Sequence, residues 1–230
     1  MKDTRLFIVP TPIGNLEDIT LRAIKILKNV DTILAEDTRV TAKLLQHLSI
    51  KKKVLSYHSQ NEHKITAKMI QRMLDGEIFA LVSDAGTPGI SDPGFLLVKQ
   101  ALEKKIVVEC LPGPTAFVPA LIKSGLPCDR FIFEGFAPQK KGKRAFFEQM
   151  KFEKRTIVFY ESPHRLIKTL ELMIEILGNE RLISISKEIS KLYEQTLTDT
   201  ILNLLNYFKQ HEPKGEYVIV VQGYTDYSFS

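Results

Sequence analysis

The residues best suited to chemistry stand in three loops rich in glycine and proline. Each loop directly follows a short apolar run: the loops are Pro10–Leu16, Ser83–Gly94 and Leu111–Ala116. Glycine lets a backbone approach a ligand without a Cβ in the way, and proline holds a loop in one shape. The second loop adds two carboxylates, Asp84 and Asp92. Because ligands bind at the carboxyl ends of strands in open α/β sheets, the three loops together predict a ligand pocket.

The same loop residues can also be explained by their structural roles alone, without a bound ligand. Turns between strands and helices use glycine and proline for their geometry alone, which would account for Gly86, Gly89 and Gly94. Asp84 could cap a turn or the start of a helix. Three such loops at one edge of a sheet favour the pocket over this alternative.

Several familiar sites are missing from the sequence. It has no G-x-G-x-x-G dinucleotide fingerprint, no P-loop, no H-E-x-x-H zinc helix and no G-x-S-x-G nucleophile elbow. His58, Glu62 and His63 have neither the order nor the spacing of a zinc helix. Since the five histidines are scattered, we assign no metal.

Positive charge is concentrated locally. The chain has 32 Lys+Arg and 27 Asp+Glu, a formal charge of +5. Residues 140–144 read Lys-Lys-Gly-Lys-Arg with no acid among them. Aromatic residues flank this run on both sides: Phe131, Phe133, Phe136, Phe146 and Phe147. Cations suit phosphates and aromatic rings stack on unpaired bases, so the segment fits single-stranded or looped RNA. The alternative is a solvated helix start whose phenylalanines face the core.

Composition fits a folded protein without a membrane span. Of the 230 residues 44% are hydrophobic and 26% charged, and no stretch approaches the ~20 apolar residues that cross a bilayer. Pro10 interrupts the first apolar run, which excludes a signal peptide there. The two cysteines, Cys110 and Cys128, form no framework. We therefore expect a cytoplasmic protein that binds no membrane.

The elements that must position these loops are strands alternating with helices. The apolar patterns predict strands at 6–9, 32–35, 54–57, 79–82, 106–111, 131–134, 156–160, 182–186 and 217–221. They predict helices at 21–28, 41–47, 65–74, 96–104, 166–177 and 201–208. The break at Leu111–Pro114 divides the chain into two α/β lobes, 1–112 and 113–230, each a mostly parallel or mixed sheet flanked by helices. A single continuous α/β domain is the alternative.

Several strings resemble one family, and the likeness extends from Leu6 to Val221. They are Pro12–Leu16, Ala35–Arg39, Ser83–Gly94, Pro112–Ala116, Phe133–Phe136 and Tyr160–Arg165. The family is the ribosomal RNA small subunit methyltransferase I group, within the tetrapyrrole methylase-like fold. The resemblance implies a two-lobed homodimer with S-adenosylmethionine as cofactor in the cleft between the lobes. It also implies 2′-O-methylation of a cytidine in the decoding region of 16S ribosomal RNA, with the RNA or the small ribosomal subunit as partner.

Two other functions stay open at this stage. The same fold methylates corrin and porphyrin precursors, so a small-molecule C-methyltransferase is the first alternative. An enclosed small substrate, however, gives no reason for a basic run beside the pocket. A non-enzymatic RNA-binding module explains that run but not the three loops.

The resemblance and the chemistry of the side chains together predict which residues form the site. The cofactor candidates are Pro12, Ile13, Gly14, Ser83, Asp84, Gly86, Thr87, Thr115, Ala116 and Tyr160. The catalytic candidates are His58, Glu161, Lys187 and Glu188, because removal of the hydroxyl proton needs a positioned base. The RNA candidates are Arg39, Lys140, Lys141, Lys143, Arg144 and Arg165. The string Glu36–Arg39 could orient the target nucleotide, with Arg39 on a phosphate. An internal pair with Asp37 is the alternative role for Arg39, and a purely structural role is the alternative for His58.

The chain departs from the family's pattern at two strings and near its end. It has Ser59-Gln60 where many relatives carry Glu-His, and Ser186–Lys191 is a variant string. It also ends soon after Val221, where many relatives continue into a helical extension. The missing extension concerns RNA affinity more than the catalytic centre, which lies upstream.

Overall fold

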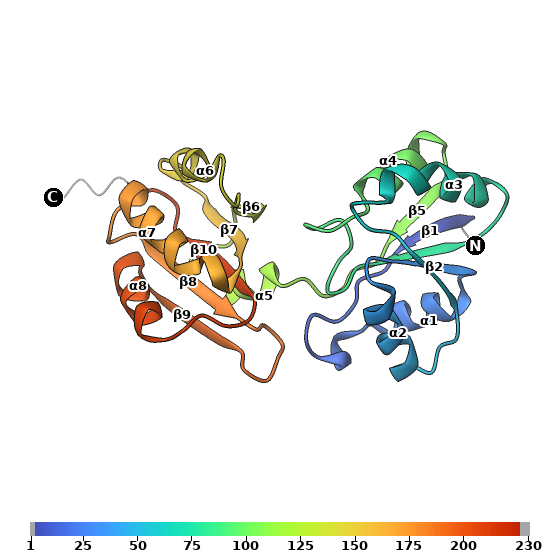
Figure 1. The fold of residues 1–230 in the computed structure, drawn as a ribbon, viewed down its shortest axis with the longest axis horizontal. Coiled ribbons are helices and arrows are strands. Elements are labelled where there is room, and N and C mark those ends of the chain that lie inside the picture. The colour runs from blue at the N-terminus through green and yellow to red at the C-terminus, as the bar shows by residue number, and fades with distance from the viewer. Residues whose placement is uncertain (1–2, 226–230) are drawn as a thin grey trace. The chain divides into compact units, whose positions relative to one another are not determined.

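Five parallel strands form the sheet of the first half of the chain. The computed structural model describes residues 3–225 and divides into two units, Met1–Thr115 and Ala116–Ser230 (Figure 1). The strands of the first unit are β1 (Thr4–Ile8), β2 (Thr32–Ala35), β3 (Lys53–Ser56), β4 (Phe79–Val82) and β5 (Val107–Cys110). Their order is β3-β2-β4-β1-β5, and every pairing is parallel. All five carboxyl ends therefore lie at the same edge.

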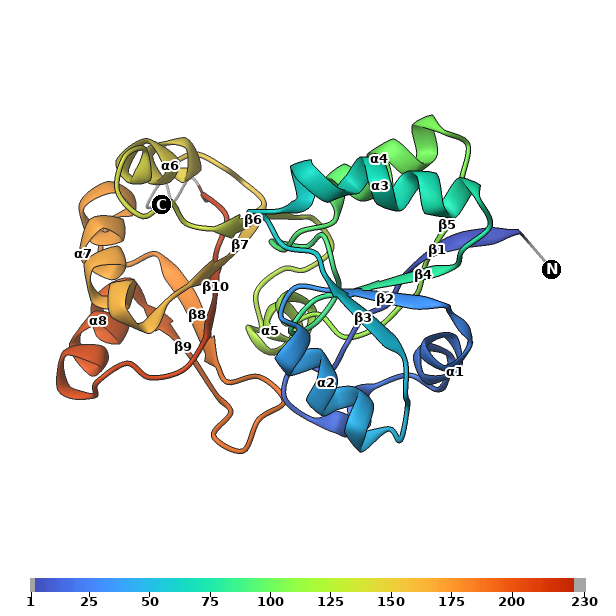
Figure 2. The ribbon, with the colours of Figure 1, turned by 45° about the vertical axis from the view of Figure 1, so that its right-hand side comes forward.

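Helices cover both faces of this sheet. They are α1 (Leu21–Asn29), α2 (Thr38–His47), α3 (Glu62–Leu74) and α4 (Phe95–Glu103), with a 3-10 turn at Leu16–Asp18. In Figure 2, α1 and α2 lie on one face and α3 and α4 on the other. Side chains along β4 alternate accordingly: Phe79 and Leu81 join the α3/α4 core, whereas Ala80 and Val82 join the α1/α2 core. Burial on both faces explains the uninterrupted apolar strands.

The second unit contains a mixed sheet. Its strands are β6 (Phe131–Phe136), β7 (Thr156–Glu161), β8 (Leu182–Lys187), β9 (Gln195–Thr200) and β10 (Tyr217–Val221). Their order is β6-β7-β10-β8-β9, with β6 and β7 parallel and the other pairs antiparallel.

The helices of this unit are α5 (Phe117–Lys123), α6 (Lys143–Met150), α7 (Leu166–Leu177) and α8 (Ile201–Gln210), with a 3-10 turn at Pro163–Arg165. The last three helices supply the main core, in which Phe147, Phe159 and Leu170 are fully buried. The short helix α5 packs against β7 and β10. No described helix is long and apolar enough to cross a membrane.

The predicted α/β alternation is confirmed. Nine of the observed strands overlap a predicted one, with bounds that differ by at most two residues. The sequence patterns missed β9, α5 and α6. The units separate at Thr115/Ala116, three residues beyond the predicted boundary at 112/113. The cofactor cleft between two lobes stays a prediction.

Candidate cofactor site at the carboxyl edge of the parallel sheet

The three glycine- and proline-rich loops of the first unit lie in direct contact. Thr11 and Gly86 form an antiparallel bridge, with N···O distances of 2.9 and 3.0 Å. The Thr11 hydroxyl donates to the Ser83 carbonyl at 3.1 Å, and the Thr87 hydroxyl donates to the Pro114 carbonyl at 3.0 Å. The loops after β1, β4 and β5 are therefore one connected structure.

Close backbone approach explains two of the loop glycines. A Cβ on Gly113 would lie 2.5 Å from Pro10 Cβ, far inside van der Waals contact. Gly86 adopts φ +84°, and a Cβ there would meet Ile13 Cγ2 at 3.3 Å. Gly89 differs, because its φ is +85° but nothing lies within 4 Å of the Cβ position. The absence of a side chain at Gly113 and Gly86 thus lets the loops pack against each other, whereas the space beside Gly89 is empty.

Gly113→Ala is expected to destabilise the protein by about 1–3 kcal/mol, because the new methyl group overlaps the Pro10 ring. It should also weaken ligand binding at the joined loops. The control is Gly125→Ala, where φ is +70° but the space is open, so it incurs backbone strain without a clash. Thermal unfolding and ligand titration test both variants. Equal loss of ligand affinity in the two would contradict this role.

Carboxylates gather beside these loops. The Asp37 amide donates to Asp84 Oδ1 at 2.9 Å, which ties the loop after β4 to the end of β2. Burial, reinforced by the nearby Asp84 carboxylate, raises the pKa of Glu36 above its ordinary value. Burial and the Glu36 and Asp84 charges raise the pKa of Asp92 to about 6, against a hydrogen bond with Ser83. Three acids at one place favour a cationic ligand.

The pKa of Asp92 predicts a pH dependence of stability. Its value of about 6 exceeds the ordinary 3.8, so the folded state binds more protons between those pH values. The free energy of unfolding therefore falls as the pH rises through this window. At pH 7.5, Asp92→Asn should raise the free energy of unfolding by about 1 kcal/mol, a value reduced because this loop is partly exposed. That corresponds to a rise in Tm of about 2–4 °C, with little effect at pH 4. Equal Tm changes at both pH values would exclude this origin.

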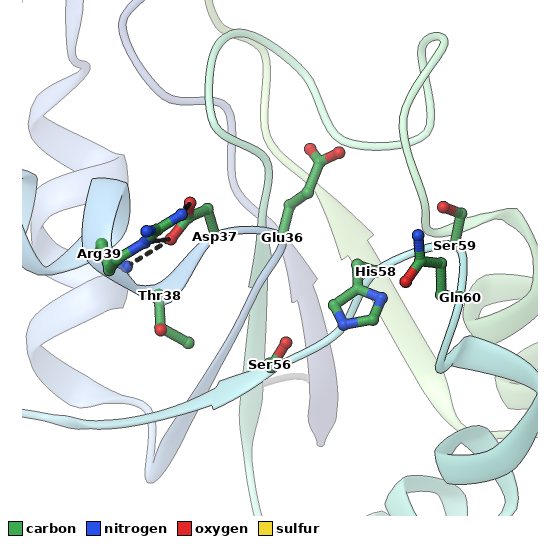
Figure 3. A pocket seen from close by; sticks show the side chains of 8 residues that line it. All are labelled: Glu36, Asp37, Thr38, Arg39, Ser56, His58, Ser59 and Gln60. Carbon is green, nitrogen blue, oxygen red and sulfur yellow. Dashed lines mark hydrogen bonds and ion pairs between the residues drawn. The ribbon is translucent and has the colours of Figure 1, made fainter.

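A separate pocket opens at the carboxyl ends of β2 and β3, with a volume of about 350 Å³ (Figure 3). Its lining residues are Glu36, Asp37, Thr38, Arg39, Ser56, His58, Ser59 and Gln60. Asp37 caps α2 through the Arg39 amide at 2.8 Å. It also pairs with the Arg39 guanidinium at 2.6 Å, which lowers the pKa of Asp37 to about 2. The internal pair considered for Arg39 is thus present, although 86% of the Arg39 side chain stays exposed.

In the second unit, Glu161 is fully buried. Its carboxylate forms an ion pair with the Arg165 guanidinium at 2.7 Å. It also accepts hydrogen bonds from the Thr169 hydroxyl at 2.6 Å and the Ser162 amide at 2.7 Å. Lys143 lies 3.4 Å from the same carboxylate and donates to Thr169 at 2.6 Å. This placement argues against Glu161 as a general base. It also leaves Lys143 and Arg165 only 13% and 21% exposed, which limits their reach to RNA phosphates.

The other catalytic candidates of this unit stand at the end of β8. Glu188 accepts from the Glu216 amide at 3.0 Å and from Lys191 at 3.1 Å. Burial alone would raise the pKa of Glu188, but these two partners hold it below its ordinary range. Glu188 is therefore a weak proton acceptor here. Lys187 is partly buried at the end of the strand, and its role stays a prediction.

The remaining candidates divide between exposed and packed positions. Lys140 and Lys141 are exposed before α6, whereas Arg144 forms ion pairs with Glu148 and Glu175. Pro12, Ile13 and Gly14 follow β1, and Thr115 ends the first unit. Ala116 precedes α5, and the Tyr160 ring packs on Phe133 and Phe136. Among residues 3–225, no group of three His, Cys, Asp or Glu could hold a metal ion.

Sequence comparison identifies the family of this chain. Residues 5–205 match the family Tetrapyrrole (Corrin/Porphyrin) Methylases. A ribosomal RNA small subunit methyltransferase I from Halalkalibacterium halodurans is 49% identical over 95% of this chain and 75% of its own length. The protein of that name from Thermotoga maritima is 44% identical over 95% of this chain and 98% of its own length. The chain belongs to the ribosomal RNA small subunit methyltransferase I family.

Solved structures agree with this family at the level of the fold. Diphthine synthase matches with a TM-score of 0.70 at 15% identity, over 96% of this chain and 90% of its own. Uroporphyrin-III-C-methyltransferase from Thermus thermophilus matches with a TM-score of 0.66 at 19% identity, over 94% and 93%. The predicted tetrapyrrole methylase-like fold is confirmed. So is the predicted family, whose members use S-adenosylmethionine.

Sequence reasoning missed part of the pocket between β2 and β3. Arg39 and His58 were nominated, but Ser56 and Gln60 were not, and Glu36 was noted only within its string. The signal that could have found them is the run of polar residues after each of the predicted strands 32–35 and 54–57; the structure adds that β2 and β3 are neighbours in the sheet.

Proposed function

We propose that this chain methylates the ribose 2′-oxygen of a cytidine in 16S ribosomal RNA, in the decoding region, with S-adenosylmethionine as methyl donor. The observation that carries this proposal is the 44–49% identity to ribosomal RNA small subunit methyltransferase I proteins over 95% of the chain. It is tested by incubating the protein with labelled cofactor and either small-subunit RNA or a tetrapyrrole precursor. Label in the tetrapyrrole but not in the RNA would overturn it.

The joined loops of the first unit fit the cofactor chemically. Bound S-adenosylmethionine supplies a methyl group already activated by a positive sulfonium. Asp84 and Asp92 provide the negative charge that a cationic ligand requires, and burial together with the Glu36 and Asp84 charges raises the pKa of Asp92. The open face at Gly89 allows close backbone contact. Ser83 and Thr87 hold the loop in shape through their hydrogen bonds.

His58 is the proton acceptor that we assign to the reaction. Methyl transfer requires alignment of the ribose oxygen and removal of its proton. A neutral imidazole ring has a nitrogen lone pair that can accept this proton. His58 is partly exposed in the pocket, and among residues 3–225 no hydrogen bond engages its ring. The carboxylates of Glu161 and Glu188, by contrast, are already engaged by cations.

RNA phosphates are expected to bind at the segment before α6. Lys140 and Lys141 are exposed, and within the described residues no acid pairs with them. Each phosphate contact contributes about 0.7–0.9 to the slope of log K against log salt concentration. Lys140→Ala/Lys141→Ala should therefore weaken RNA binding and reduce that slope by roughly 1.5, as measured by fluorescence anisotropy between 50 and 200 mM salt.

The matched control removes the same charge from another basic run. Lys51→Ala/Lys52→Ala lowers the net charge equally, but in the first unit, before β3. It should leave the slope nearly unchanged. If both double variants reduce the slope alike, RNA responds to net charge rather than to residues 140–141. Cofactor affinity should be unaffected in both.

The partners and location follow from the same proposal. We propose a cytoplasmic homodimer acting on 16S ribosomal RNA or on the small ribosomal subunit. Light scattering of the purified protein tests the dimer, with a mass of twice 26.2 kDa expected and 26.2 kDa as the contrary result. Methylation rates on naked RNA and on isolated subunits distinguish the two substrates.

A further inference from the structure

The pocket between β2 and β3 combines the groups that a nucleotide needs. Figure 3 shows Glu36 between the Asp37–Arg39 pair on one side and His58 on the other. Arg39 is the cation of this lining, and Ser56 adds a hydroxyl. Its volume of about 350 Å³ lies within the usual range for small-molecule sites, about 300–1,000 Å³. A site for one nucleotide, flanked by more RNA outside, fits this arrangement.

Glu36 occupies a fixed place in the pocket. It directly follows the buried strand β2. The next residue, Asp37, is fixed through both its backbone amide and its side chain. The Asp37 amide donates to Asp84 at 2.9 Å, while the Asp37 carboxylate binds Arg39. The backbone that carries Glu36 is thus anchored to the loop after β4 and to α2. An anchored backbone limits the positions that the Glu36 carboxylate can reach, so the carboxylate presents its acceptor oxygens to one part of the pocket.

We propose that Glu36 reads the base of the target nucleotide by accepting a hydrogen bond from the cytosine N4 amino group. Carboxylates are suited to that donor. Uracil presents the O4 acceptor at the same position, and two acceptors repel each other. Arg39, which is mostly exposed, then binds a phosphate next to the target. This inference rests on the proposed function and adds the residue that selects cytidine over uridine.

Glu36→Gln tests the inference with two RNA substrates. The target cytidine is first located by mass spectrometry of RNA methylated by the wild-type protein. RNA with cytidine or uridine at that position is then used to measure kcat/KM. We expect the wild type to prefer cytidine by about 5- to 150-fold. A glutamine amide can accept from N4 or, when flipped, donate to O4, so Glu36→Gln should reduce the preference to within about threefold.

Two further variants support the comparison. Glu103→Gln makes the same chemical change on the exposed end of α4 and should keep the wild-type preference. Glu36→Asp keeps the charge with a shorter reach, so it should lower the rate but still favour cytidine. Circular dichroism and cofactor titration establish that each variant folds and binds S-adenosylmethionine.

The outcomes separate this inference from the proposed function. A collapsed preference in Glu36→Gln alone supports base reading. Equal loss of kcat/KM on both RNAs, or a wild type that does not distinguish them, overturns base reading but leaves RNA methylation in place. A wild type that binds the cofactor and methylates no RNA overturns the proposed function, and the inference with it.

Discussion

Asp84→Ala is expected to raise the dissociation constant for S-adenosylmethionine by about 10- to 150-fold, the equivalent of about 1.5–3 kcal/mol for a lost charged hydrogen bond. The variant removes a carboxylate from the acidic cluster and releases the Asp37 amide, which Asp84 holds at 2.9 Å. Both effects act on the joined loops at the edge of the parallel sheet. Isothermal titration calorimetry measures the change directly.

A matched variant separates charge from loop anchoring. Asp84→Asn keeps an oxygen that can accept from the Asp37 amide but removes the charge. If charge dominates, it should lose nearly as much cofactor affinity as Asp84→Ala. Asp75→Asn, on the exposed end of α3, is the control and should bind like the wild type. Wild-type affinity in both Asp84 variants would exclude Asp84 from the cofactor site.

Glu161→Gln is expected to destabilise the second unit by about 3–5 kcal/mol, because it leaves two cations with a buried, neutral partner. Arg165 at 2.7 Å and Lys143 at 3.4 Å would lose the charge that balances them. A loss of this size corresponds to a fall in Tm of roughly 6–20 °C. Differential scanning calorimetry measures it.

The control for this variant is Glu171→Gln on α7. Glu171 pairs with Lys209 at 3.1 Å, but its side chain is 48% exposed. Surface pairs of this kind are worth about 0–1 kcal/mol, so the expected change in Tm is at most about 4 °C. A fully stable Glu161→Gln protein that has lost only kcat would contradict the structural role and restore Glu161 as a candidate base.

Strands were predicted well from the sequence because burial on both faces produces uninterrupted apolar runs, as in Phe79–Val82. The strand β9 was missed because Gln195–Thr200 is mostly polar and only partly buried. The helix α5 has seven residues and contains Pro119, so no helical period could develop. The basic run at 140–144 does include a helix start, since α6 begins at Lys143, and Phe147 is buried in the core.

The edge of the parallel sheet was predictable because each loop follows a recognisable strand. What could not be predicted is which side chains are already engaged. Glu161 and Glu188 are residues of a type that can act as catalytic bases. Their partners in the structure show instead that Glu161 belongs to a buried ion network and that Glu188 anchors a loop. The lining of the pocket near His58 depends on the pairing of β2 with β3, which strand order along the chain does not determine.

The identity of the methylated nucleoside tests the proposed ribose methylation most directly. Small-subunit RNA is incubated with the protein and S-adenosylmethionine, digested completely and analysed by mass spectrometry. We expect 2′-O-methylcytidine at one position, in a greatly reduced amount with the Asp84→Ala variant at limiting cofactor. A methyl group on a base, or no methylated nucleoside with protein that binds the cofactor, would contradict it.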